Sequence, residues 1–292
     1  MSLTLVQAWG AARKRLEAAG VDGPVLDARL LVEAACDATR ADIITDPHRP
    51  LTEDQAGRLD ALLTRRERRE PVSHILGRQG FWKIMLRVSD KVLTPRPDSE
   101  AIVDFVLRTH PEDQAFSILD LGVGSGALIL AILAERPAAH GLGIDVSEEA
   151  LEIARDNAAT LGLADRCVLA RGDWTTGLED DSFDVIVSNP PYIATEVIAG
   201  LQPEVRDYEP MLALDGGPDG LAPYRILAGE ILRVLKPGGR FAVEIGYDQK
   251  AAVERLFSEA GALEVVTLPD LGGRDRVVVG VKNPLGKTGL NR

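Results

Sequence analysis

The stretch that decides the fold is 185–192, which reads Val-Ile-Val-Ser-Asn-Pro-Pro-Tyr. Its β-branched half predicts a buried strand, and the first proline ends that strand because proline cannot donate to a β-ladder and disfavours helical geometry in the residue before it. A rigid polar loop is therefore expected at the edge of a sheet. In this loop the Asn189 side chain offers an acceptor and a donor, the Pro190 carbonyl adds an acceptor, and Tyr192 supplies a flat face. With Pro191 these residues form a predicted pocket for a planar group that carries an NH2, although the same composition is common in ordinary loops at strand ends.

A glycine-rich turn, 120–126, reads Asp-Leu-Gly-Val-Gly-Ser-Gly and lies where a predicted strand passes into a helix. Glycines there let the backbone bend tightly and let a ligand approach main-chain N–H groups. A second strand ends at Asp145, the position that binds a ribose in such folds. Asp173 and Trp174 end a third strand and offer an acceptor for an amine and a surface for adenine, although a tryptophan is as often a core residue. The cofactor-binding residues expected from these patterns are Asp120, Gly122, Val123, Gly124, Ser125, Gly126, Asp145, Asp173 and Trp174.

Two cofactor classes compete for this turn. Residues 122–127 can be aligned to the dinucleotide pattern G-x-G-x-x-A, which would make the protein an oxidoreductase. Asp120 favours the other class, because a carboxylate repels a pyrophosphate and attracts the ammonium and sulfonium groups of S-adenosyl-L-methionine. We therefore expect S-adenosyl-L-methionine as cofactor and S-adenosyl-L-homocysteine as product.

Strand and helix patterns alternate from residue 117 onward, which predicts an α/β domain with a mainly parallel sheet and helices on both faces. Seven strands are expected, at 117–121, 141–145, 167–171, 183–188, 240–245, 263–268 and 277–281. The intervening helices are expected at 101–107, 128–135, 148–160, 224–235 and 249–259.

The chain ahead of this domain predicts a small helical domain and a connector. Pro24 suits the first position of a helix, 52–55 has capping-box spacing, and 65–70 is expected to be a solvated helix end. Residues 72–94 have a β-like composition and predict a hairpin, followed by the proline-rich segment 94–100. The expected boundaries are 1–70 for the helical substrate-recognition domain, 71–98 for the connector, 99–282 for the α/β domain and 283–292 for a polar tail.

Composition narrows the class of protein. Residues 1–98 carry 16 Lys/Arg and 14 Asp/Glu, whereas the rest carries 17 and 31, so the α/β domain is acidic and direct nucleic-acid binding is not expected. Cys36 and Cys167 lie far apart and are expected to be buried thiols, with no metal site. No signal peptide or membrane span is indicated, which predicts a cytoplasmic protein.

The combination of these motifs resembles the class I S-adenosylmethionine-dependent methyltransferases that act on planar amino nitrogens. The chain is most similar to the protein-(glutamine-N5) methyltransferases that modify peptide chain release factors. That resemblance covers nearly the whole chain and includes the segments 94–100 (Thr-Pro-Arg-Pro-Asp-Ser-Glu), 205–210, 213–221 and the glycine pair 238–239. Val123 and Ser99 stand where threonine is expected in relatives.

The resemblance implies a fold, a reaction and a partner. The fold is a seven-stranded Rossmann-like methyltransferase domain preceded by a helical domain and a β-hairpin. The reaction is methylation of the glutamine side-chain amide in the Gly-Gly-Gln motif of class 1 release factors, by a monomeric enzyme that binds no membrane. Asn189, Pro190, Pro191 and Tyr192 would hold the acceptor and carry catalysis, and Asn189 would also contact the cofactor. The alternative is an amino-methyltransferase acting on adenine or guanine of RNA or DNA, which would share the Asn-Pro-Pro-Tyr loop but usually carries a basic target-binding region.

Overall fold

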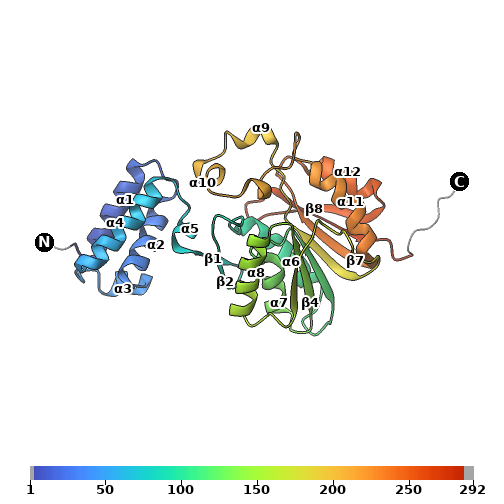
Figure 1. The fold of residues 1–292 in the computed structure, drawn as a ribbon, viewed down its shortest axis with the longest axis horizontal. Helices are drawn as coiled ribbons and strands as arrows, with labels where there is room; N and C mark the ends of the chain where they lie inside the picture. Colours follow the sequence, from blue (N-terminus) through green and yellow to red (C-terminus); the bar gives the residue numbers. More distant parts are fainter. Residues whose placement is uncertain (1–2, 286–292) are drawn as a thin grey trace. The chain divides into compact units, whose positions relative to one another are not determined.

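The computed structural model describes residues 3–285 and divides the chain into two compact units (Figure 1). One unit contains the chain up to Arg78 together with Gln202–Tyr208, and the other contains Gln79–Leu201 together with the chain from Glu209. The segment Gln202–Tyr208 thus belongs to the first unit although it follows the Asn-Pro-Pro-Tyr loop in sequence. The end of the predicted polar tail, 286–292, lies outside the described residues.

The α/β unit contains one seven-stranded sheet in the order β5-β4-β3-β6-β7-β9-β8. The strands β3, β4, β5, β6 and β7 run parallel to their neighbours, whereas β9 pairs antiparallel with β7 and β8. Their bounds are β3 Ser117–Leu121, β4 His140–Asp145, β5 Cys167–Arg171, β6 Phe183–Ser188, β7 Leu235–Glu244, β8 Ala262–Pro269 and β9 Asp275–Lys282. The predicted seven-stranded, mainly parallel sheet is confirmed.

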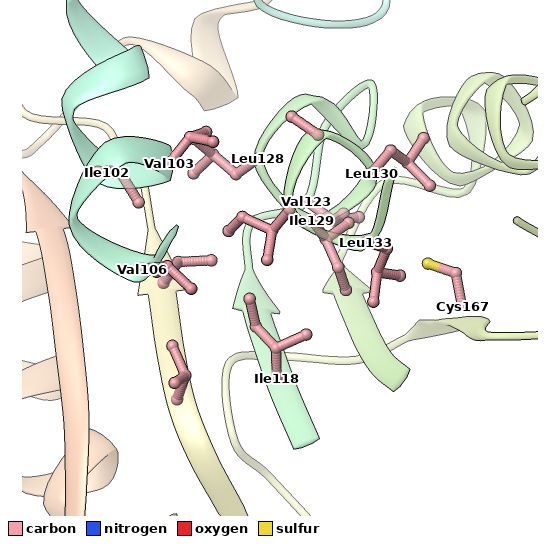
Figure 2. Packing of buried hydrophobic residues seen from close by; sticks show 14 of the residues in the cluster. Ile102, Val103, Val106, Ile118, Val123, Leu128, Ile129, Leu130, Leu133 and Cys167 are labelled. Atoms are coloured by element: carbon pink, nitrogen blue, oxygen red, sulfur yellow. The ribbon is translucent and has the colours of Figure 1, made fainter. Parts of the chain in front are cut away.

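Helices cover both faces of this sheet (Figure 1). α6 (Glu100–Thr109), α7 (Ala127–Glu135) and α8 (Glu148–Thr160) pack on one face, and α11 (Ala222–Val234) and α12 (Lys250–Glu259) pack on the other. Successive strand residues point to opposite faces, so Ile118 joins the first core (Figure 2) and Leu119 joins the second. The central strand β3 is buried along its whole length, as is the carboxyl half of β6, which accounts for their largely apolar sequences.

Helix α7 lies so close to the sheet that β4 needs a glycine beneath it. A Cβ atom at Gly141 would lie 2.6 Å from Ile129 Cδ1 and 2.8 Å from Ile118 Cγ2, closer than carbon atoms can pack. Glycine at this position therefore lets α7 pack directly on β4.

The α/β unit also contains a two-stranded sheet and several short helical turns, and one further short helix, α10, belongs to the other unit. β1 (Arg78–Phe81) and β2 (Ile84–Arg87) form the predicted two-stranded sheet and are joined at Trp82, whose φ of 52° is left-handed. Between β6 and α11 the chain forms α9 (Thr195–Ile198), α10 (Pro203–Arg206) and a 3-10 turn at Met211–Ala213, and another 3-10 turn covers Pro97–Ser99.

Two boundaries differ from the sequence-based expectation. Residues 72–76, expected in the β-rich connector, form a helical turn that follows Pro71 and ends at Gly77, whose φ is 66°. β7 begins at Leu235, ahead of the Lys-Pro-Gly-Gly run, and its register against β6 shifts between the pairs Phe183–Leu235 and Val185–Arg240. The strand expected at 240–245 therefore begins earlier, at Leu235, and enters the sheet through a bulge.

The helical unit is built from α1 (Leu5–Ala18), α2 (Pro24–Cys36), α3 (Arg40–Thr45), α4 (Glu53–Glu67) and α5 (Val72–Leu76), together with α10. Its core contains Leu16, Leu31 and Val32, which are fully buried. The predicted capping box at Thr52 is confirmed, since Thr52 Oγ1 accepts from the Gln55 N–H at 3.2 Å and Gln55 Oε1 accepts from the Thr52 N–H at 3.0 Å. Cys36 and, in the other unit, Cys167 are buried free thiols, as expected.

An ion cluster fastens Gln202–Tyr208 to α4 within the helical unit. Arg66 is only 4 % exposed and binds Asp27 at 2.8 Å and Glu204 at 2.9 Å. Arg69 also binds Glu204, at 2.6 Å. Burial tends to raise the pKa of Glu204, but hydrogen bonds from the two arginines hold it below the ordinary value. The expectation of a solvated helix end is thus wrong for Arg66, because its partner lies 138 residues further along the chain.

Replacing Arg66 tests the strength of this cluster. Arg66→Met should lower the free energy of unfolding of the helical unit by about 2 kcal/mol or more, because it leaves two largely buried carboxylates without their shared cation. Arg58→Met on the same helix is the matched control; its pair with Asp37 is exposed on both sides, so the change should cost about 0.5 kcal/mol or less. Urea unfolding of the full chain measures both, and equal losses would contradict the assignment.

Candidate active site

The two loops singled out by the sequence meet because β3 and β6 are neighbours. Leu121 pairs with Ser188 in parallel register, and the buried Ser188 hydroxyl donates to the Leu121 carbonyl at 2.7 Å. The carboxyl ends of parallel strands lie at one edge of the sheet, where ligands bind in open α/β folds. A cavity of about 250 Å³ opens at this edge.

The cavity wall contains most of the residues predicted for the site. They are Asp120, Gly122, Val123, Gly124, Ser125, Asp145, Asp173, Trp174, Asn189 and Pro191. Gly126, Pro190 and Tyr192 do not line the wall. Gly126 instead caps α7 with a φ of 85°, and Tyr192 packs its ring against the core on the α11 and α12 side.

Asp120 provides a buried carboxylate at the base of the glycine turn. Its side chain is 1 % exposed, and burial raises its pKa to about 7, with a smaller contribution from the nearby charge of Asp145. Its Oδ2 accepts from the Ile129 N–H at 3.2 Å, whereas its Oδ1 has no hydrogen-bond partner among the described residues. A buried carboxylate in this condition favours a cationic or proton-donating ligand.

The glycine turn is held in a ligand-ready geometry by β4. Gly122 and Gly124 have φ values of 74° and 53°, which glycine adopts without strain. The N–H groups of Gly122 and Val123 both donate to the Ile144 carbonyl. Asp145 accepts from the Gly124 N–H and the Ser147 N–H, each at 2.9 Å, so its carboxylate is fixed at the cavity wall.

Trp174 forms a partly buried wall near the glycine turn. A Cβ atom at Gly122 would lie 3.9 Å from Trp174 Cζ3, an ordinary contact distance. The residue holds a left-handed φ of 48°, a strained geometry for a bulky side chain. Together with Asp173 it offers an aromatic and an acidic surface at the end of β5.

The side-chain amide of Asn189 has its nitrogen bound to the protein and its oxygen available to a ligand. Its Nδ2 donates to Ser99 Oγ at 3.2 Å, while its buried Oδ1 has no hydrogen-bond partner among residues 3–285. Because Asn189 lines the cavity, this oxygen is suited to accept a hydrogen bond from a ligand.

Behind Asn189 lies Glu244, a carboxylate that sequence reasoning did not identify. Glu244 is 1 % exposed and accepts from Ser99 Oγ at 2.5 Å and from the Tyr192 hydroxyl at 3.2 Å. Burial raises its pKa to about 7, while the Ser99 hydrogen bond and the charge of Arg276 act in the opposite direction. Burial also raises the pKa of Tyr192, so the phenol stays protonated and acts as a donor.

The proline-rich segment 94–100 completes the wall. Pro95 and Ser99 line the cavity, and Arg96 binds the buried Glu209 at 2.5 Å. Further along, Pro210, Leu212 and Ala213 line the same cavity. In the sequence, this wall was indicated by the proline-rich segment and by the family resemblance of 94–100, 205–210 and 213–221.

Among residues 3–285, no helix is long and apolar enough to cross a membrane. The same residues contain no cluster of three or more potential metal ligands.

Comparison with known proteins gives two family matches. Residues 7–77 match the family described as PrmC N-terminal domain, and residues 112–267 match a methyltransferase domain family. A release factor glutamine methyltransferase of Caulobacter vibrioides is 66 % identical over 98 % of this chain and 99 % of its own length. A protein of the same name from Agrobacterium fabrum is 45 % identical over 92 % of this chain and 94 % of its own. Among solved structures, a methyltransferase from Pyrococcus furiosus aligns at 21 % identity with a TM-score of 0.49, covering 68 % of this chain and 88 % of that chain.

The raised pKa of Asp120 predicts pH-dependent binding of a cationic ligand. Ionised Asp120 attracts the cation and protonated Asp120 does not, so affinity for S-adenosylmethionine should fall as the pH drops through about 7. Below that pH the loss should approach about tenfold per pH unit. Isothermal titration calorimetry measures it. Asp120→Asn should bind weakly at every pH, and a flat profile for the unaltered protein would show that Asp120 does not face the cation.

Proposed function

Because the chain belongs to the release factor glutamine methyltransferase family and is a methyltransferase, we propose that it methylates the glutamine side-chain amide in the Gly-Gly-Gln motif of class 1 peptide chain release factors. The observation that carries this proposal is the Asn189 side chain, whose nitrogen is bound to Ser99 and whose oxygen is left to accept from a ligand. An acceptor-only group at a cavity wall fits an NH2 donor.

The cavity residues fit S-adenosylmethionine as the cofactor. Asp120 would hold a cationic part of it, Asp145 the ribose hydroxyls, and Asp173 and Trp174 the adenine. Gly122, Val123, Gly124 and Ser125, which line the cavity, would approach the methionine part through main-chain atoms, whereas Gly126 caps α7. When bound, this cofactor supplies an electrophilic methyl group on a cationic sulfur.

The Asn-Pro-Pro-Tyr loop is suited to activate an amide nitrogen as the methyl acceptor. An amide nitrogen is a poor nucleophile because its lone pair is delocalised, so the enzyme must orient it towards the methyl group. Asn189 Oδ1 on the cavity wall would accept one hydrogen of the glutamine NH2, and the carbonyl of Pro190, the next residue of the loop, would accept the other. Tyr192 was expected to cover the amide but packs against the core, so Pro191 on the wall would exclude water in its place. The nitrogen gains the methyl group and releases one proton to solvent, so no strong base is required.

The helical unit is proposed to recognise the release factor, with the enzyme acting in the cytoplasm as a monomer. The charge distribution supports a protein substrate over a nucleic acid, since the chain from residue 99 carries 31 Asp/Glu against 17 Lys/Arg. A nucleobase amino-methyltransferase would be expected to attract phosphates.

Mass spectrometry of a class 1 release factor incubated with enzyme and S-adenosylmethionine tests the substrate. We expect a mass gain of one methyl group, localised to the glutamine of the Gly-Gly-Gln motif. Transfer to DNA or RNA without transfer to the release factor would support the nucleobase alternative and contradict the proposal.

Asn189→Ala tests the role of the acceptor loop. Transfer should fall by about 10²-fold or more, because the acceptor amide loses an orienting partner. Binding of S-adenosylhomocysteine, followed by calorimetry, should change little. A parallel loss of cofactor binding and turnover would make Asn189 chiefly a cofactor residue.

A further inference from the structure

A continuous hydrogen-bond chain runs from the acceptor loop into the sheet. Asn189 Nδ2 donates to Ser99 Oγ at 3.2 Å, and Ser99 Oγ donates to Glu244 Oε2 at 2.5 Å. Glu244 Oε1 accepts from the Tyr192 hydroxyl at 3.2 Å. The buried Glu244 carboxylate is therefore linked to both ends of the Asn-Pro-Pro-Tyr loop, to Asn189 through Ser99 and to Tyr192 directly.

Glu244 sets which group donates and which accepts in each of these hydrogen bonds. In its ionised form, which Arg276 favours, Glu244 only accepts hydrogen bonds, so the Ser99 hydroxyl donates its hydrogen to Glu244. Its remaining capacity towards Asn189 is that of an acceptor, which only the NH2 end of the Asn189 amide can satisfy. The Asn189 oxygen is consequently turned away from Ser99.

We propose that Glu244, acting through Ser99, is a positioning residue that fixes the amide orientation of Asn189 so that Oδ1 receives the NH2 of the acceptor. This inference rests on the proposed function. It attributes the orientation of the Asn189 amide to Glu244 and Ser99, which lie outside the Asn-Pro-Pro-Tyr motif. Without the carboxylate, the Ser99 hydroxyl can donate to Asn189, and the amide can turn its NH2 towards the acceptor, where two donors would face each other.

The surroundings of Glu244 match a positioning role. Its backbone carbonyl accepts from the Tyr224 hydroxyl at 2.7 Å, which fixes the end of β7. Arg276 and Asp98 are the charged groups that act on its carboxylate, with Arg276 favouring ionisation. Placing a carboxylate in a fully buried site costs stability, so a network that served folding alone would be better built from neutral groups.

Two substitutions of Ser99 that differ only in a hydroxyl group test the contribution of that hydroxyl to transfer. Ser99→Thr and Ser99→Val add side chains of nearly the same shape, but only threonine keeps the donor and acceptor. We expect Ser99→Thr to retain at least about tenfold more kcat than Ser99→Val, with the KM for the release factor differing by about threefold or less. Equal activity of the two variants would overturn the proposal.

A second test separates positioning from folding. Glu244→Gln should lower kcat by about tenfold or more while the thermal midpoint is unchanged or rises, since a buried charge is removed. Glu230→Gln is the control, because Glu230 also accepts a hydroxyl hydrogen bond, from Thr175, but does not contact Ser99 or Tyr192. In the Ser99→Val background, Glu244→Gln should have almost no further effect on kcat; full additivity would show that Glu244 does not act through Ser99.

A readout without substrate keeps this inference separate from the proposed function. The Asn189 side-chain NH2 signal in a ¹H–¹⁵N spectrum, identified by its loss in Asn189→Ala, should shift in Glu244→Gln and not in Glu230→Gln. An unshifted signal would overturn the positioning role whether or not release factors are substrates. Failure of the unaltered enzyme to methylate a release factor, with the shift present, would instead reject the proposed substrate.

Discussion

The pairing of β3 with β6 is the constraint on which the site depends. These two strands carry the glycine turn and the Asn-Pro-Pro-Tyr loop, and their parallel register ends at the Leu121–Ser188 pair, locked by the Ser188 hydroxyl. Strand order reverses here: β4 and β5 lie on one side of β3, and β6 and β7 lie on the other. A crevice forms where crossovers diverge in this way, so the cofactor residues and the acceptor loop face one cavity.

Two buried carboxylates, Asp120 and Glu244, act on opposite parts of this site. Each is almost completely buried and has a pKa raised to about 7. They differ in their partners: one oxygen of Asp120 is unpaired among the described residues, whereas both oxygens of Glu244 accept hydrogen bonds from protein side chains. The first is suited to bind a cationic ligand, and the second is suited to orient its neighbours.

The sequence predicted those features whose causes are local. Apolar runs specify strands buried on both faces, glycines specify a left-handed turn, and Thr52 and Gln55 specify a capping box. The seven-stranded sheet and the helical unit followed from such patterns.

Contacts between distant residues could not be predicted in this way. Ser99 and Glu244 are 145 residues apart, so the sequence marked the segment that contains Ser99 but gave no sign that Glu244 is its partner. The burial of Arg66 depends on Glu204 in a segment that returns to the helical unit only in three dimensions. The helical turn at 72–76 was missed because its β-branched composition outweighed the proline before it and the glycine after it.

The central claim is that the methyl acceptor is the glutamine side-chain amide of the release factor. The most direct measurement compares transfer of an isotopically labelled methyl group to a class 1 release factor and to the same factor with the glutamine of its Gly-Gly-Gln motif replaced by leucine. Leucine has no amide but nearly the same size, so folding of the motif is disturbed little. The account predicts label in the first protein and none in the second. Equal labelling of both would contradict it.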